Sequence, residues 1–173
     1  MLKVAQKIGV TLLIFCVFVA ANQTPKSEYA VKGAILCKIC SYAKWTPTNG
    51  ESFIIGIIGQ LPEGSNISVP KNYLISGKKA ELRTIHNLNE ISDCQAVFVT
   101  ESASSQLDKI LTLTKNKEIL TFCDRSELLR QGLMFNLIMV GSKVKFEINR
   151  KPIRETNISV SAPIYEVALR VLE

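Results

Sequence analysis

Cysteines are the residues in this chain whose spacing most directly suggests chemistry. Cys37 and Cys40 form a Cys-x-x-Cys pair, and Cys94 and Cys123 follow further along. Such a pair at the start of a helix is a redox motif, because the helix dipole lowers a thiol pKa there. Here the pair falls in the middle of an expected helix over residues 27–44, with Cys40 at the edge of its apolar arc and Cys37 on its polar side. We therefore favour structural cysteines over a thiol oxidoreductase.

The same four cysteines allow more than one covalent state. In an oxidising compartment they could form two disulfides, in any of three pairings. Each disulfide would contribute about 2–4 kcal/mol if it were unstrained. The alternative is four free, buried thiols, and the sequence leaves these states open.

Other catalytic and metal-binding patterns are missing from the sequence. A zinc site needs four converging nitrogen or sulfur ligands, and beyond the cysteines the only strong candidate is His86, the single histidine. The sequence contains no Gly-x-Ser-x-Gly elbow and no glycine-rich phosphate loop. No catalytic, cofactor-binding or metal-binding residue is predicted, and the chain is not predicted to be an enzyme.

The expected first helix carries one charged residue on its apolar side. Ser27 is a plausible N-cap, and the helix should run to about Lys44 before Pro47 interrupts it. Lys32 falls in the middle of the apolar arc. Either its ammonium extends past the apolar surface into water, or it points at a partner or a bound anion.

Three apolar runs predict central strands of a parallel sheet, at residues 52–59, 94–100 and 119–123. A helix capped by Ser102 or Ser104 should connect the last two strands. A short helix near residues 71–76 and a short strand at 81–88 complete this half. An open parallel sheet has a crevice at the carboxyl ends of its strands. Its rim would here carry five residues: Gly59, Thr100, Glu101, Asp124 and Arg125.

The C-terminal part predicts a β-hairpin followed by helices. Residues 133–140 form a strand that is apolar on both faces, and residues 143–149 alternate as a strand near a sheet edge does. Gly141-Ser142 between them suits a type II′ turn. After a helical turn at 151–156, the last helix should begin at Ser161 and extend through Val171. The predicted fold is a single three-layer α/β domain with a mostly parallel sheet, a C-terminal antiparallel hairpin and flanking helices.

The N-terminus predicts export. Lys3 and Lys7 precede an apolar run that ends in small residues at Ala20-Ala21, as in a cleaved signal peptide. This divides the chain into a signal peptide (1–21) and a domain (22–173). Loss of the two lysines lowers the formal charge from +6 to +4. The remaining charges are interspersed, whereas a nucleic-acid-binding protein gathers them into a stripe.

The order and spacing of several segments resemble YfiR-like proteins. These segments are Tyr29 to Leu36, Trp45 with a proline close behind, Phe53 to Gly59, Cys94 to Val99, Ile119 to Phe122, Gly132, Lys145 to Asn149, and Ile158 to Ser161 followed by Ala168. Lys145 to Asn149, the sequence KFEIN, is the most specific. The chain departs from the family pattern at Thr46, which separates Trp45 from Pro47.

The resemblance implies an exported, periplasmic α/β domain without catalytic activity. Its best-known members repress a membrane-bound diguanylate cyclase by binding its periplasmic portion, and so control cyclic di-GMP signalling and biofilm formation. A sensor kinase is an equally compatible target. The resemblance also implies a homodimer, and it marks Lys32 and Trp45 as family positions and candidate partner-binding residues. The alternatives are a periplasmic small-molecule-binding domain at the strand-end crevice and, with less support, a thiol oxidoreductase.

Overall fold

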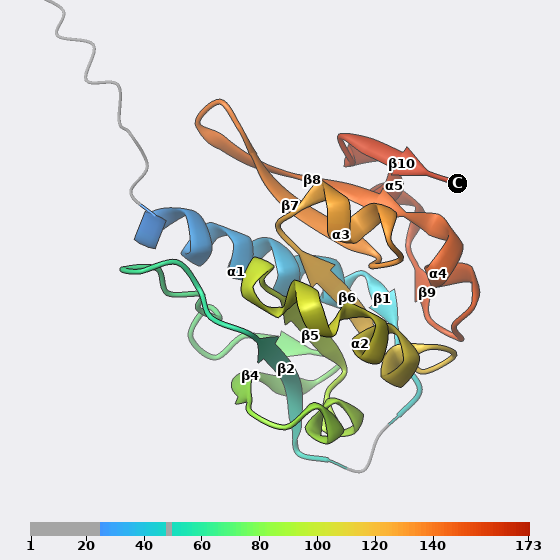
Figure 1. The fold of residues 1–173 in the computed structure, drawn as a ribbon. Coiled ribbons are helices and arrows are strands. Elements are labelled where there is room, and N and C mark those ends of the chain that lie inside the picture. The colour runs from blue at the N-terminus through green and yellow to red at the C-terminus, as the bar shows by residue number, and fades with distance from the viewer. Residues whose placement is uncertain (1–24, 48–49) are drawn as a thin grey trace, which may run out of the picture.

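The computed structural model describes residues 25–47 and 50–173, so the expected signal peptide lies outside the described residues. One eight-stranded sheet dominates the fold (Figure 1). Its strands are β2 (Ser52–Ile58), β3 (Leu74–Ile75), β4 (Lys78–Ile85), β5 (Ala96–Val99), β6 (Leu120–Cys123), β7 (Phe135–Val140), β8 (Lys143–Asn149) and β10 (Arg170–Leu172). Their order across the sheet is β10-β8-β7-β6-β5-β2-β4-β3.

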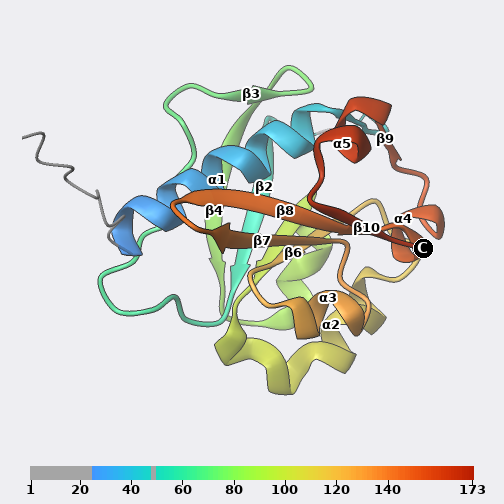
Figure 2. The same cartoon turned by 90° about the horizontal axis from the view of Figure 1, so that it is seen from above.

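Helices cover both faces of this sheet. They are α1 (Pro25–Ser41), α2 (Leu107–Thr114), α3 (Ser126–Arg130), α4 (Arg150–Arg154) and α5 (Ala162–Val167), with 3₁₀ helices η1 (Leu88–Asp93) and η2 (Glu101–Gln106). Figure 2 shows α1 crossing one face, with α2 and α3 on the other. A second, two-stranded sheet joins β1 (Ala43–Lys44) to β9 (Ser159–Val160). No helix in the described residues is long and apolar enough to cross a membrane.

The five central strands β4, β2, β5, β6 and β7 are parallel to one another. β7 and β8 form the antiparallel hairpin, and β3 pairs antiparallel with β4. The predicted three-layer α/β fold is therefore confirmed, as is the parallel strand–helix–strand unit of β5, α2 and β6.

Two hydrophobic cores result, because side chains alternate between the faces of each strand. Under α1 lie four fully buried rings: Phe53, Phe98, Phe122 and Phe135. The opposite core contains Val97, Val99, Ile110 and Leu129. Each large side chain removed from water contributes about 1.5–3 kcal/mol. Every residue of β5 and β6 is buried, as expected for strands covered on both sides.

The hairpin confirms its predicted turn and its predicted place near a sheet edge, but not the predicted exposure of Glu147. Gly141 has φ +60°, the positive value that the first central position of a type II′ turn requires. β8 is the second strand from the edge, because β10 pairs with it in parallel. Glu147, expected on the water-facing side, is 4% exposed. β7 is covered on both sides only near its start, and Val140 at its end is exposed.

The C-terminal helix is shorter than predicted. α5 begins after Ser161 as expected but ends at Val167, so the prediction of a helix through Val171 was wrong. Residues 170–172 instead form β10, which pairs with the backbone groups of β8 that would otherwise lie at an open edge. The backbone N–H of Leu169 donates to the carbonyl of Phe146 at 2.8 Å and guides the chain into this pairing.

Four other boundaries also differ from the predictions. The expected helix at 71–76 is a turn leading into β3, with Asn72 and Ser76 at positive φ. The strand expected at 81–88 is β4, which starts and ends three residues earlier. α1 begins at Pro25 and ends at Ser41, so Ser27 is not its N-cap and Lys44 lies in β1. α2 begins at Leu107 after a 3₁₀ segment, and neither Ser102 nor Ser104 caps it.

Gly33 lets the loop after β2 pass directly against α1. A Cβ atom at this position would lie 2.1 Å from the backbone oxygen of Ser68. No side chain fits there unless the helix and the loop separate. The glycine thus fixes the distance between α1 and the segment that leads to β3.

We therefore predict that Gly33→Ala destabilises the domain, although alanine favours helices over glycine by about 1 kcal/mol. The backbone clash should lower the free energy of unfolding by about 1–3 kcal/mol, as overpacking does. Urea denaturation measures this change. Ala34→Gly, at an exposed position of the same helix, measures the difference in helix propensity between alanine and glycine without a clash. A Gly33→Ala protein that is more stable than the unaltered protein would contradict the close approach.

Candidate functional site

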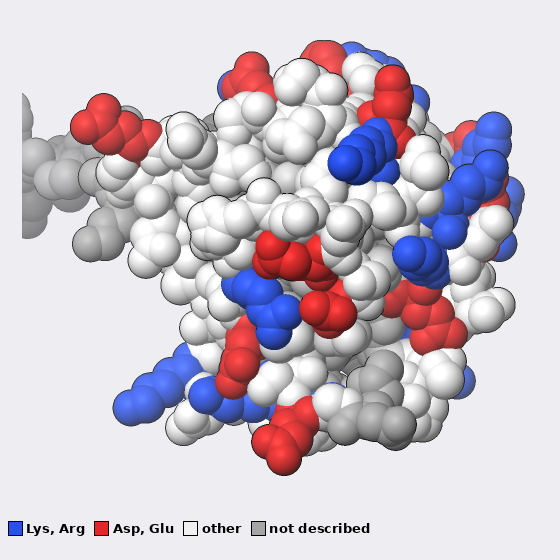
Figure 3. Space-filling model, turned by 60° about the horizontal axis from the view of Figure 1, so that its bottom comes forward, with Lys and Arg blue, Asp and Glu red and all other residues white. Residues whose placement is uncertain are grey.

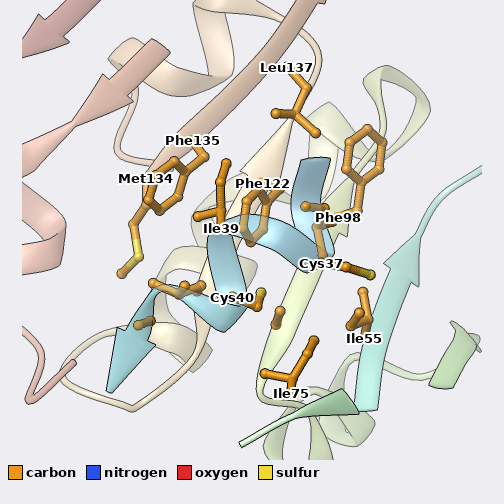
Figure 4. Close-up of a cluster of buried hydrophobic side chains, with 14 of the residues drawn as sticks. Cys37, Ile39, Cys40, Ile55, Ile75, Phe98, Phe122, Met134, Phe135 and Leu137 are labelled. Carbon is orange, nitrogen blue, oxygen red and sulfur yellow. The ribbon is translucent and has the colours of Figure 1, made fainter. Parts of the chain in front are cut away.

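The four cysteines of the described residues are free, buried thiols. Cys37 and Cys40 lie in the core between α1 and the sheet, among Ile55, Phe98 and Phe122 (Figure 4). The expectation that Cys37 faces the polar side of the helix was wrong, because it is 0% exposed. α1 is covered by the sheet and by the loop around Ser68, so its buried arc is wider than one face.

Burial also sets the acidity of these thiols. It raises the pKa of Cys37 and of Cys94 to about 11, and that of Cys123 to about 12. The pKa of Cys40 is raised well above its usual value, also by burial. All four are therefore protonated at neutral pH. Since the thiolate is the reactive form, this geometry does not provide a redox nucleophile.

Lys32 lies inside the molecule and is 3% exposed, so its side chain does not extend into water. Its Nζ atom lies 2.6 Å from a carboxylate oxygen of Glu28 and 3.3 Å from Oδ2 of Asp124. It also lies 4.3 Å from the centre of the Tyr29 ring, and the Tyr29 hydroxyl donates to the same Oδ2 atom. These contacts join the beginning of α1 to the carboxyl end of β6.

Trp45 joins the other end of α1 to the sheet. Its Nε1–H donates to the carbonyl of Cys40 at 2.9 Å, and its ring packs edge-on against Phe53 at 5.0 Å between centroids. The side chain is half-buried. Lys32 and Trp45, the two candidate partner-binding residues, thus hold the middle and the C-terminal end of one helix.

A second buried carboxylate belongs to Glu147 in β8. Its Oε2 atom accepts from Asn136 at 2.8 Å and from Ser126 at 3.1 Å, and its Oε1 atom lies 2.6 Å from Arg170. The sequence analysis did not identify this cluster. Asn136 was the residue that could have indicated the cluster, because a single amide in an apolar strand needs a polar partner. Asn136 pairs directly with Glu147 across the hairpin.

An apolar groove of about 350 Å³ runs between α1, β8 and α5. Tyr42 and Val167 are exposed at its rim, at 37% and 64%, and the half-buried Phe146 lies within it. Lys38 and Lys145 are the charged residues that line it, and neither has a carboxylate partner among the described residues. An exposed apolar surface of this kind marks a site of interaction.

A polar crevice of about 360 Å³ lies at the carboxyl ends of the parallel strands. It brings together four of the five predicted rim residues, Thr100, Glu101, Asp124 and Arg125. Arg125 and Glu101 form an ion pair across its mouth, and this pairing raises the pKa of Arg125. The predicted crevice is therefore present.

The described part of the chain contains no metal cluster. No group of three or more histidine, cysteine, aspartate or glutamate side chains there could hold a metal ion. His86 is exposed just after β4. On the face shown in Figure 3, basic and acidic side chains lie among one another.

The buried position of Lys32 predicts a large cost for its removal. Lys32→Met leaves two carboxylates beside an apolar side chain and should lower the free energy of unfolding by about 3 kcal/mol. Lys38→Met is the matched control on the same helix, exposed and without an ion pair, and should change stability by less than about 0.5 kcal/mol. Urea denaturation of both proteins tests this, and equal effects would show that the Lys32 contacts do not stabilise the fold.

The raised thiol pKa values predict a loss of stability in alkali. Burial raises the folded pKa of Cys37 to about 11 from an ordinary 9.0, so its contribution is complete below pH 9 and is lost as pH rises towards 11. In the presence of reductant, the free energy of unfolding of Cys37→Ala should fall less steeply with pH over that range than that of the unaltered protein. The two slopes should differ by at most about 1.4 kcal/mol per pH unit. Parallel slopes for the two proteins would argue against a protonated, buried Cys37.

Comparisons with known proteins agree with this geometry. No protein with a curated description matches the chain. The ABC domain in complex with L-Trp from Streptococcus pneumonia shares the fold, with TM-score 0.51 and 13% identity over 69% of this chain and 55% of that one. A conserved domain protein from Vibrio cholerae O1 biovar El Tor follows, with TM-score 0.47 and 11% identity over 83% of this chain and 59% of its own. The chain thus spans less than two thirds of either structure.

The sequence model of one family, DUF4154, described as YfiR/HmsC-like, matches residues 29–169. The match extends from Tyr29 in α1 to Leu169 before β10, and so includes nearly all of the described domain. The chain belongs to this YfiR/HmsC-like family, which includes periplasmic regulators of cyclic di-GMP signalling.

Proposed function

We propose that the protein is an exported regulator that binds the periplasmic portion of a membrane signalling protein and holds its output off. A diguanylate cyclase is the favoured target, and a sensor kinase is the alternative. The observation that carries this proposal is the family match over residues 29–169. Removal of residues 1–21 during export, and action as a homodimer, are part of the proposal.

The groove between α1, β8 and α5 is the surface we propose for this partner. Its exposed apolar residues, Tyr42 and Val167, would be removed from water by a segment of the partner. Lys38 and Lys145 line the groove without carboxylate partners among the described residues, so the segment that fits should carry acidic side chains beside its apolar ones. The occupant we propose is therefore a short amphipathic segment of the sensor portion.

Lys32 and Trp45 serve this surface indirectly in our proposal. Lys32 is buried, and Trp45 donates its N–H to the end of α1. Both therefore act by holding α1 in position, and α1 supplies Ile35 and Ile39 to the groove, with Tyr42 directly after its last residue. The thiol oxidoreductase alternative has less support, because the cysteines are buried and protonated.

The test is crosslinking of the mature domain to bacterial membranes, followed by identification of the captured protein. We expect an inner-membrane protein with a cyclase or kinase output domain. Val167→Asp should weaken its capture by at least about tenfold, because a charge replaces an apolar side chain in the interface. Leu74→Asp is the matched control, since Leu74 is similarly exposed, at 60%, but belongs to β3 at the far edge of the sheet.

Two results would contradict the proposal at different levels. If the captured proteins lack any signalling output domain, the proposed function fails. If a signalling protein is captured equally by Val167→Asp and Leu74→Asp, the function stands and the groove is not the docking surface. Light scattering on the purified domain gives the number of subunits in the same preparation.

A further inference from the structure

The order of strands places a topological switch point between β2 and β5. The chain leaves β2 for β4 on one side, whereas it leaves β5 for β6 on the other side. In open α/β sheets, the segments that follow such a pair of strands diverge, and ligands bind in the space between them. The polar crevice lies at this position, since Gln60 follows β2 and Thr100 follows β5.

The crevice is built from several elements and has the size of a ligand site. Gln60 and Leu61 come from the end of β2, Glu101 from the end of β5 and Asp124 from the end of β6, while Tyr29 reaches it from α1. Its volume of about 360 Å³ lies within the range of small-molecule sites.

Asp124 has an acceptor that the protein does not use. Its side chain is 8% exposed, and both of its donors, Tyr29 and Lys32, bind the same oxygen, Oδ2. The other oxygen, Oδ1, is buried and has no hydrogen-bond partner. A buried acceptor without a donor is unfavourable, and a ligand that donates to it would remove that cost.

The charges around Asp124 do not cancel. Lys32 lies between two carboxylates, those of Glu28 and Asp124, which leaves one formal negative charge. Arg125 does not neutralise it, because Arg125 forms its ion pair with Glu101. A ligand that complements the crevice therefore carries positive charge as well as an N–H donor.

We propose that this crevice is a binding site for a small organic cation, an alkylamine whose ammonium donates to Asp124. The alkyl part would lie against Leu61 and Pro62, the apolar part of the lining. This site is separate from the apolar groove and does not depend on the proposed partner.

Three four-carbon compounds with cationic, neutral and anionic end groups test the proposal. Putrescine should bind the mature domain in titration calorimetry at low salt and neutral pH, with one site. Butane-1,4-diol and succinate, the neutral and anionic counterparts, should bind at least about tenfold more weakly, because neither places a charged donor at Asp124. Equal binding of the three compounds, or no binding of putrescine, would overturn the proposal.

Variants at two positions locate the site. Asp124→Asn should weaken putrescine at least about tenfold, whereas Asp108→Asn, an exposed aspartate on α2, should leave it unchanged. Since Asp124→Asn also removes a partner of Lys32, the exposed Gln60 provides a second test that leaves the buried contacts intact. Gln60→Glu should tighten binding and Gln60→Lys should weaken it, and a lack of any difference between them would place putrescine elsewhere.

Discussion

The packing of α1 across one face of the sheet is the constraint on which both surfaces of this protein depend. A parallel sheet that is apolar on both faces needs a layer on each side, and α1 is the long helix that covers the side of the four phenylalanines. The same helix supplies Ile39 to the groove and Tyr29 to the crevice. A shift of α1 would therefore change both surfaces at once.

Contacts of different kinds hold this helix along its length. Apolar burial fixes one side of it, with Leu36 and Ile39 each 1% exposed, and the close approach at Gly33 fixes its distance from the neighbouring loop. Polar contacts hold it at two places, near its middle through Lys32 to Asp124 and at its C-terminal end from Trp45 to the carbonyl of Cys40. Apolar contacts allow sliding, whereas directional hydrogen bonds and ion pairs determine the register. These polar contacts therefore give α1 a defined position.

The strands could be predicted from the sequence because their signal is local. Continuous apolar runs identified β2, β5 and β6, and alternation with Gly141 identified the hairpin. The missed features depend on residues far apart in the chain. Lys32 was placed correctly on the apolar arc, but its burial depends on Asp124, 92 positions later. β10 formed where a helix was expected, because the open edge of β8 offered hydrogen bonds that no local pattern records. The strand-end crevice was predicted from topology, whereas the groove requires the packing of α1 against α5.

The two buried carboxylates show why burial alone does not identify a site. Glu147 has donors on both oxygens and a cationic partner in Arg170, so its environment is complete and its role is to join β8 to β10 and α3. This accounts for the KFEIN segment as a structural signature. Asp124 is almost equally buried, yet its donors all reach one oxygen and its charge is only partly compensated. The two carboxylates differ because one oxygen of Asp124 has no hydrogen-bond partner. The chain supplies partners for both oxygens of Glu147 from its own residues. It leaves Oδ1 of Asp124 without a partner, and Asp124 lines a cavity that a ligand could enter.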